Sequence, residues 1–334
     1  MTRYLRPLGI LSGPAARWAV DQDKALPLAG GPLAFSLVEI IERSRESQIV
    51  PAAELAGELA RHTAPRGQFA DGPIVMGIVN ATPDSFSDGG AYIDSDRAIA
   101  HGLSMIAAGA GIIDVGGEST RPGATPLDPA EEATRVVPVI QRLSATGVLV
   151  SIDTRNARTM DAALEAGAGL INDVTALTHD PDSLIFAAST DVPVVLMHMQ
   201  GDPTNMQRAP SYRDVALDIY DYLSARIATA EAAGIARARL ILDPGIGFGK
   251  TTEHNLALLD QLSLFHGLGV PLLVGVSRKG FIGHLSGGAA VDKRLGGSLA
   301  AGLAAIGQGA QILRVHDVAE TVQAVRIVRA LWES

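Results

Sequence analysis

The run Asn80–Gly90, Asn-Ala-Thr-Pro-Asp-Ser-Phe-Ser-Asp-Gly-Gly, places many side-chain oxygens and tight turns directly after the apolar stretch Ile74–Val79. Such a stretch is typical of a buried strand. Carboxylate, amide and hydroxyl oxygens are ligands for a hard cation, and glycine-rich turns offer backbone N–H donors to an anion. Turns of this composition are also common where no chemistry occurs, so the run matters because other strands end in the same way.

Seven further polar segments follow apolar runs along the chain. They are Asp114–Gly123, Ser151–Thr154, Asn172–Val174, Met197–Gly201, Asp243–Lys250, Ser277–Gly280 and Arg314–Asp317. An unpaired polar group is costly to bury, so eight polar strand ends are hard to explain by stability alone. We therefore expect them to meet at one binding site.

Three of these segments supply groups that could line a deep slot. Asp153 and Asp243 could each accept two N–H bonds from an amino-pyrimidine edge, and the amide of Asn172 could both donate and accept. Lys279 could donate to a ring carbonyl or nitrogen. This set suits a flat heterocycle such as a pterin or a purine. For any one carboxylate, a helix cap or an ion pair with Lys or Arg is about as good an interpretation.

Two basic residues come near the end of the expected barrel. Arg314 and His316 are two positions apart, so their side chains point the same way along a strand. Together with Asn80 they could bind a phosphate or diphosphate through charge-assisted hydrogen bonds.

The apolar runs and the amphipathic stretches between them alternate along the chain, which predicts strands buried on both faces and separated by helices. The expected strands are Ile74–Val79, Gly111–Gly116, Gly147–Ile152, Ala168–Asn172, Pro193–His198, Arg239–Asp243, Pro271–Val276 and Ala310–Val315. The expected helices are Ser95–Ala108, Pro129–Leu143, Ala157–Ala166, Pro181–Ser189, Tyr212–Ala233, Glu253–Phe265, Lys293–Gly307 and Val318–Leu331.

Eight strand–helix units in about 260 residues predict an α/β fold, a (β/α)8 TIM barrel over residues 73–334 with an N-terminal extension. A doubly wound open sheet is the alternative. We expect the extension, residues 1–72, to hold a strand at Leu33–Ile41 and a helix around Ala52–Arg61. A cap over the barrel's N-terminal face is the preferred role for it, ahead of a regulatory or dimerisation appendage.

Composition excludes several classes of protein. The 334 residues include no cysteine, which excludes disulfides, thiolate metal sites and cysteine nucleophiles. The net charge of −9 argues against a nucleic-acid partner. No run approaches the roughly 18 apolar residues of a membrane span, so we expect no membrane partner and a cytoplasmic location.

In this order, the polar segments resemble those of the dihydropteroate synthase family. The resemblance covers about residues 74–331, and Asn80–Gly90 and Gly116–Gly123 are its most specific segments. It implies condensation of 6-hydroxymethyl-7,8-dihydropterin diphosphate with p-aminobenzoate, giving 7,8-dihydropteroate and pyrophosphate. It further implies a role in folate synthesis, a requirement for Mg²⁺, inhibition by sulfonamides and assembly as a homodimer.

The resemblance also implies roles for individual residues. Catalysis would involve Asp153, Lys279, Arg314 and Arg121. Asp153, Asn172, Asp243 and Lys279 would hold the pterin, with Met197 and Val174 packed on its faces; Asn80 would reach the metal; Arg314 and His316 would hold the diphosphate; Phe86, Thr120, Arg121, Pro122 and Phe248 would shape the p-aminobenzoate pocket. One position departs from the family pattern: Gly280 stands where many relatives have a hydroxyl residue.

Two other functions compete with the synthase. A pterin-dependent methyltransferase domain would share the slot but would need neither the Gly116–Gly123 segment nor the Arg314-Val-His316 pair. A catalytically silent, pterin-binding paralogue would be expected to have lost the first two loops, and both are intact.

Overall fold

The computed structural model describes residues 3–70, 72–81, 90–118, 127–202 and 205–334. Eight parallel strands lie side by side in the order β10-β9-β8-β7-β6-β5-β12-β11. Their bounds are β5 Ile74–Asn80, β6 Ile112–Gly116, β7 Leu149–Asp153, β8 Leu170–Asp173, β9 Val194–Met197, β10 Leu240–Asp243, β11 Leu273–Val274 and β12 Ile312–Val315. Each predicted strand is present, and most are one or two residues shorter than expected.

The two ends of this sheet meet. The end strands β10 and β11 are joined by an isolated parallel bridge between Leu242 and Leu272, and the Leu242 N–H donates to the Pro271 carbonyl at 2.9 Å. The sheet therefore closes into the predicted barrel, and the open-sheet alternative is wrong. The seam is short, because β11 has only two residues in the sheet.

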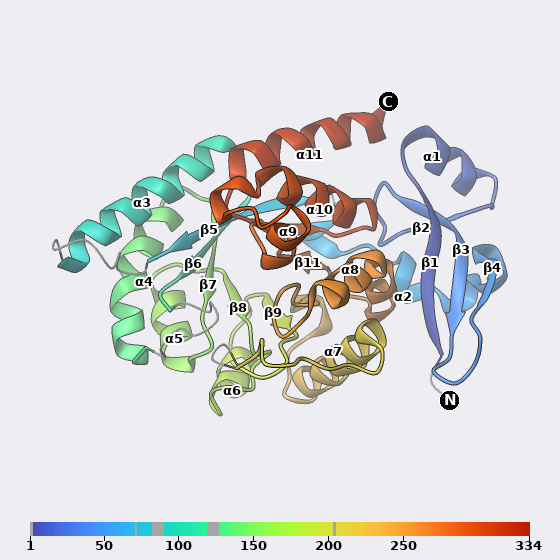
Figure 1. Ribbon diagram of the computed structural model, residues 1–334. Coiled ribbons are helices and arrows are strands. Elements are labelled where there is room, and N and C mark those ends of the chain that lie inside the picture. The colour runs from blue at the N-terminus through green and yellow to red at the C-terminus, as the bar shows by residue number, and fades with distance from the viewer. Residues whose placement is uncertain (1–2, 71, 82–89, 119–126, 203–204) are drawn as a thin grey trace.

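Helices surround the barrel, with α3 and α11 along one side and α5, α6 and α7 along the other (Figure 1). Their bounds are α3 Gly90–Ala108, α4 Pro129–Ser144, α5 Ala157–Glu165, α6 Ser183–Ala188, α7 Val215–Ala232, α8 Thr252–Asp260, α9 Gly280–Leu285, α10 Leu295–Gly307 and α11 Val318–Glu333. Asp128 caps α4 by accepting from the N–H groups of Ala130 and Glu131, as a residue preceding a first-turn proline often does.

Two helical segments differ from the prediction. The stretch predicted as one helix over 253–265 divides into α8 and a 3-10 helix, Leu262–Leu268. Helix α9 was not predicted, because its six residues are too few for a recognisable period. No helix among the described residues is both long enough and apolar enough to cross a membrane.

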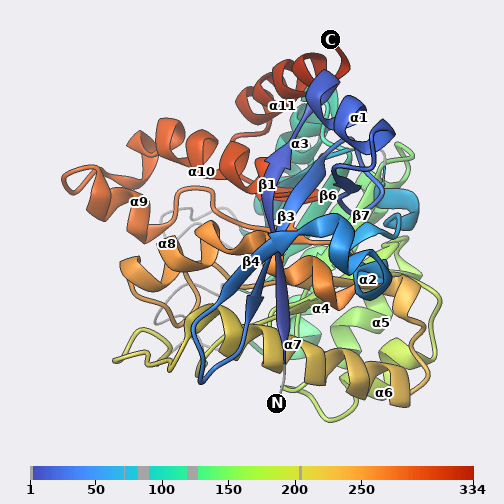
Figure 2. The same cartoon turned by 90° about the vertical axis from the view of Figure 1, so that its right-hand side faces the viewer.

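The N-terminal extension forms an antiparallel sheet beside the barrel, in front of it in Figure 2. Strand β3 pairs with β1, β2 and β4; the bounds are β1 Tyr4–Leu11, α1 Gly13–Asp21, β2 Leu26–Pro27, β3 Ala34–Ile41 and β4 Gln48–Pro51. The predicted strand at 33–41 is confirmed as β3. The single helix predicted at 52–61 is wrong: a 3-10 helix, Ala52–Glu58, is followed by the short helix α2, Ala60–Thr63, so the path changes at Leu59.

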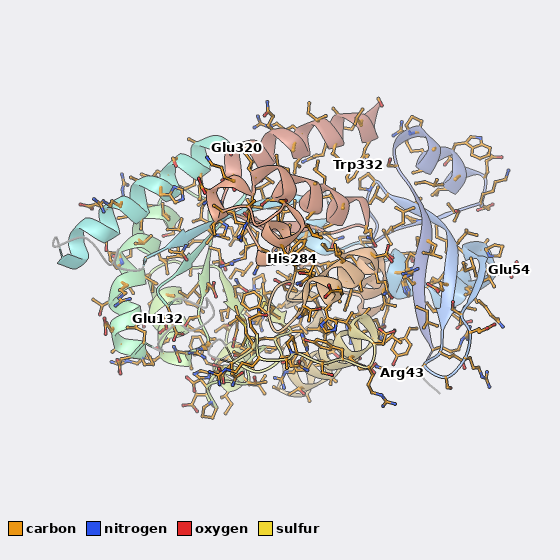
Figure 3. The ribbon with its side chains drawn as sticks, in the orientation of Figure 1. Arg43, Glu54, Glu132, His284, Glu320 and Trp332 are labelled. Carbon is orange, nitrogen blue, oxygen red and sulfur yellow. The ribbon has the colours of Figure 1, made fainter. Side chains whose placement is uncertain are left out.

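Ionic and aromatic contacts hold the extension against helix α7. Arg43 bonds Asp218 at 2.7 Å and Asp221 at 2.8 Å, and its Nε donates to the Tyr4 hydroxyl at 3.1 Å. That hydroxyl lies 3.0 Å from both carboxylate oxygens of Asp221. Arg43 is labelled beside α7 in Figure 3.

A second contact joins the extension to the end of the chain. Arg17 donates to the carbonyl of Trp332 at 2.8 Å. Trp332 is labelled in Figure 3 at the end of α11, facing α1. The extension is thus fixed to both α7 and α11.

Phe69 connects the extension to the barrel interior. Its ring is 4% exposed and packs in an apolar cluster with residues from all eight strands. The cluster contains Met76, Ile112, Leu170, Val195, Ile241, Leu273 and Ile312, with Ile74 and Leu149 packed against it. These residues lie in the amino-terminal halves of their strands, so Phe69 fills the end of the barrel opposite the polar strand ends.

We predict that Phe69→Ala lowers the free energy of unfolding by about 3 kcal/mol, because it leaves a cavity in a closed apolar layer. Urea titration followed by circular dichroism measures this. The matched control is Ile185→Ala, whose side chain is 71% exposed on α6 and whose loss should change stability by less than about 0.5 kcal/mol. Equal midpoints for the two variants would contradict the assignment of Phe69 as a barrel plug.

Candidate active site

A pocket opens at the carboxyl-terminal ends of the barrel strands, where the sites of this fold lie. It encloses about 430 Å³ including its open mouth. Its lining residues are Ile78, Asn172, Val174, Met197, Asp243, Phe248, Gly275, Ser277, Lys279, Arg314 and His316. Eight of the residues singled out in the sequence thus line one cavity.

Arg314 links a set of polar side chains that we call the pocket floor, which consists of Arg314, Asp114, Asp153, Asn172 and Asp243. Its Nε donates to Asp114 Oδ2 at 2.6 Å, and its Nη2 donates to Asp153 Oδ2 at 2.5 Å. The guanidinium therefore joins strand β12 to both β6 and β7. Burial raises the pKa of Asp153, and the Arg314 cation opposes that shift. The sequence predicts Asp153 in the pterin slot and Arg314 on the diphosphate; the structure adds a direct bond between the two side chains, which the sequence did not indicate.

Asn172 and Asp243 are both buried beside this pair. Asn172 Nδ2 donates to Asp114 Oδ2 at 3.0 Å, and Asp243 Oδ1 accepts from the Gly245 N–H at 2.7 Å. Burial raises the pKa of Asp243, while the Gly245 hydrogen bond and the Lys279 cation oppose the change. Each side chain keeps further capacity for hydrogen bonds, so the floor can present both donors and acceptors to a flat ring.

Apolar side chains stand beside these polar groups. Val174 is 4% exposed and Met197 is 2% exposed, and both line the pocket. A ring with polar edges and apolar faces would match this arrangement, because its edges could bond to the floor while its faces pack on Val174 and Met197.

Lys279 and Phe248 lie together at another part of the wall. The Lys279 Nζ lies 4.0 Å from the centroid of the Phe248 ring, a distance typical of a cation–π contact. Burial lowers the pKa of Lys279 to about 8, with a further contribution from the Arg314 cation. Lys279 therefore releases its proton much more easily than an exposed lysine.

His316 reaches the pocket from the end of β12. Its Nδ1 lies 3.0 Å from the Ser277 hydroxyl oxygen, and the same hydroxyl accepts from the His316 backbone N–H at 3.1 Å. Burial and the neighbouring Arg314 cation lower the pKa of His316 to about 4. The imidazole is therefore neutral at pH 7, so it can hydrogen-bond to an anion but adds no positive charge of its own.

Asn80 ends β5 with an exposed side chain, beside Gly116 in the sheet register. Its amide oxygen is the kind of ligand that Mg²⁺ accepts, and Mg²⁺ commonly binds through one or two protein oxygens together with substrate phosphates and water. Among the described residues no group of three or more His, Asp and Glu side chains could hold a metal by itself. The Asn80 amide oxygen could therefore serve as one protein ligand of such a metal.

Four of the predicted site residues, Phe86, Thr120, Arg121 and Pro122, lie outside the described residues. The segments on either side of 119–126 are described. Glu118 accepts from Arg155 at 2.9 and 3.0 Å and from the Leu127 N–H at 3.1 Å. The Glu118 carboxylate thus joins the described segments on both sides of 119–126 to the end of β7.

Sequence reasoning missed Asp114. The residue is 0% exposed, and Oδ2 accepts from both Arg314 and Asn172, while Oδ1 has no partner among the described residues. The sequence does contain a signal for it, because a charged residue inside the apolar run Ile112–Val115 must be buried with a partner.

Lys250 is a second residue near the pocket for which the sequence indicates no role. Its Nζ lies 3.0 Å from His198 Nδ1 and donates to the Phe248 carbonyl at 2.9 Å. Burial lowers the pKa of Lys250 to about 7, although the Asp243 carboxylate opposes this. Lys250 therefore ties the loop that carries Phe248 back to the end of β9.

Comparison with known proteins shows the family of this chain. Residues 76–316 match the family of pterin binding enzymes. The Escherichia coli K12 dihydropteroate synthase is 50% identical over 259 residues, which cover 77% of this chain and 91% of that protein. The chain belongs to the dihydropteroate synthases.

Two solved structures from Xanthomonas albilineans support this assignment. A dihydropteroate synthase with 4-aminobenzoic acid is 51% identical, with a TM-score of 0.74 over 78% of this chain and 93% of that one. A dihydropteroate synthase in complex with 7,8-dihydropteroate is 48% identical, with a TM-score of 0.71 over 78% and 94%. The family prediction is confirmed, and as a dihydropteroate synthase the chain is a transferase of folate biosynthesis rather than a silent paralogue.

We predict that Asp114→Asn weakens pterin binding at least tenfold, because it removes a buried anionic partner from Arg314 and changes an acceptor of Asn172. Calorimetric titration with the pterin diphosphate, without p-aminobenzoate, measures the change. Asp161→Asn, an exposed change on α5, is the control and should bind as the unchanged protein does. Unaltered affinity in Asp114→Asn would show that this carboxylate has no part in the site.

We also predict an alkaline limit to activity near pH 8. The pKa of Lys279 is lowered, so its charged form is lost as pH rises through about 8, and the free enzyme's kcat/KM for the pterin should fall by up to tenfold per pH unit above that value. In Lys279→Arg the cation persists and the limit should disappear from the range pH 7–9.5, whatever the absolute rate. A limit at the same pH in both proteins would assign it to another group.

Proposed function

We propose that this synthase binds 6-hydroxymethyl-7,8-dihydropterin diphosphate in the pocket above Arg314 and joins it there to p-aminobenzoate. The observation that supports the assignment is a pocket lined by the buried Asn172 and Asp243 and by Lys279, beside the apolar side chains of Val174 and Met197. The buried Asp153 is bonded to Arg314, which lines the same pocket. The polar groups match the edge of a pterin in hydrogen-bonding capacity, and the walls match its faces.

The reaction replaces one bond by another. The C–O bond between the pterin methylene and the diphosphate breaks, and its electron pair leaves with the diphosphate. The amine nitrogen of p-aminobenzoate then supplies the pair for the new C–N bond and releases a proton to solvent. We infer a dissociative order, because a dihydropterin can carry the transient cation and the carboxylates of the floor favour positive charge above them.

The residues of the pocket would divide this work. Asp153, Asn172, Asp243 and Lys279 hold and orient the pterin, and the walls exclude water from the methylene carbon. Arg314 lies between the pterin-binding carboxylates and the diphosphate, which it would bind through its positive charge. The neutral His316 would donate a hydrogen bond to the diphosphate but would add no positive charge. A bound diphosphate would raise the pKa of His316 and strengthen that contact.

Mg²⁺ is part of this proposal. Asn80 would provide a protein oxygen, and the metal when bound would neutralise charge on the leaving diphosphate. The p-aminobenzoate side would be formed by Phe86, Thr120, Arg121 and Pro122 together with Phe248. A Cβ at Gly280 would meet no atom of the described residues within 4 Å, so this position has room for the p-aminobenzoate carboxylate beside the first N–H groups of α9.

We further infer a homodimer and a cytoplasmic location. Ile327 and Leu331 are 61% and 64% exposed and lie one turn apart on α11, where an apolar pair on an outer helix would suit a second copy of the chain. The cytoplasmic location is inferred from the folate-pathway role. Sedimentation velocity of the purified chain measures the assembly state.

The decisive measurement is pyrophosphate release by the purified chain, with the pterin diphosphate and Mg²⁺, in the presence and absence of p-aminobenzoate. We predict release that depends on p-aminobenzoate, stops on chelation of the metal, and is matched by dihydropteroate formation. Arg121→Ala should raise the KM for p-aminobenzoate at least tenfold and leave the pterin affinity unchanged.

Tight pterin binding without turnover would contradict the synthase assignment. Activity that survives complete removal of divalent metal would contradict the metal assignment alone. An Arg121→Ala protein with unchanged KM and kcat would overturn only the role of that arginine.

A further inference from the structure

Strand β8 ends between two residues that line the pocket, and a turn at Ala176 and Leu177 follows it. Asn172 and Val174 face the site, while Asp173 between them is 0% exposed and does not line the pocket. Asn172 is fixed by the sheet, since it pairs with Asp153 and its carbonyl accepts from the Thr154 N–H at 3.1 Å. Val174 lies one residue beyond the end of β8, so its position depends on the turn that follows.

That turn is strained. Ala176 and Leu177 are consecutive, buried, non-glycine residues with φ of +54° and +59°. L-residues with a Cβ rarely adopt this left-handed conformation, and it persists only where the surroundings enforce it. Strain of this kind often occurs at functional sites.

The Asp173 carboxylate enforces the conformation from within. Oδ1 accepts from the Thr175 N–H at 2.7 Å and from the Thr175 hydroxyl at 2.6 Å, and Oδ2 accepts from the Leu177 N–H at 3.0 Å. From outside, Arg226 Nε of α7 donates to the Ala176 carbonyl at 3.0 Å. Burial raises the pKa of Asp173 to about 6, so the fold retains a carboxylate that is unfavourable to bury.

We propose that Asp173 is a positioning residue of the pterin pocket, which holds the left-handed turn at Ala176 and Leu177 and thereby fixes Val174 against the face of the heterocycle. The inference rests on the proposed use of this pocket for the pterin. It assigns Asp173 no contact with substrate, so its effect must pass through the turn.

The test compares Asp173→Asn with a matched carboxylate in the same region. Asp180 also accepts from two backbone N–H groups, those of Ala157 and Asp182, but it does not line the pocket. Asp173→Asn should raise the KM for the pterin diphosphate about tenfold, with kcat and the KM for p-aminobenzoate changed less than threefold. Asp180→Asn should leave both KM values unchanged, even if it lowers the melting temperature.

A second set of variants tests the role of the backbone strain at Ala176. Glycine adopts positive φ without the Cβ penalty, so Ala176→Gly alone should behave as the unchanged protein. In the double variant Asp173→Asn/Ala176→Gly, the pterin KM should recover at least threefold. If Asp173→Asn does not fold, Thr175→Val removes only the hydroxyl contact and should raise the pterin KM two- to threefold.

Three results would overturn the proposal: a pterin KM in Asp173→Asn within twofold of the unchanged protein, equal increases in both KM values, or no recovery in the double variant. Calorimetric titration with 6-hydroxymethyl-7,8-dihydropterin diphosphate alone gives the same comparison without turnover. If the unchanged protein binds the pterin but makes no dihydropteroate, the proposed function is contradicted. The pterin affinities of the Asp173 variants can still be compared in that case.

Discussion

The site depends on one partly buried cation, Arg314, between two buried carboxylates. Arg314 bonds Asp114 and Asp153 within 2.6 Å, and the arginine is contributed by the last strand of the barrel while its partners come from the second and third. An isolated charge in such a position would be prohibitively unfavourable. The three groups are therefore stable only together, and their pairing sets the register in which the ends of β6, β7 and β12 converge.

The two halves of the barrel consequently have different roles. The amino-terminal half is an apolar layer completed by Phe69, and it contributes stability without chemistry. The carboxyl-terminal half contains the buried carboxylates, Asn172 and the lysines, which are unfavourable for stability but can bind a substrate. The apolar layer offsets part of that cost, which is why an extension outside the barrel can matter to a site at its opposite end.

Much of the barrel could be predicted from the sequence because its strands are buried on both faces and appear as continuous apolar runs. Of the extension, only strand β3 was predicted correctly. Strand β1 could not be predicted, because it is half-buried and contains Pro7 and Gly9, so its pattern is weak. The pairing of Arg314 joins residues 161 and 200 positions apart, and no local spacing indicates it. Asp173 was missed for a related reason: its role depends on the backbone angles of Ala176 and Leu177, which apolar residue types conceal.

A substrate in this pocket would also contact the junction at which the barrel closes. Strands β10 and β11 are joined by a single bridge, and Asp243 and Lys279 stand on either side of it at the pocket wall. A pterin bonded to both residues would connect the two sides of this junction and act as a non-covalent clasp. Because a ligand that binds a folded form stabilises it, a pterin bonded to both residues would strengthen this junction of the barrel.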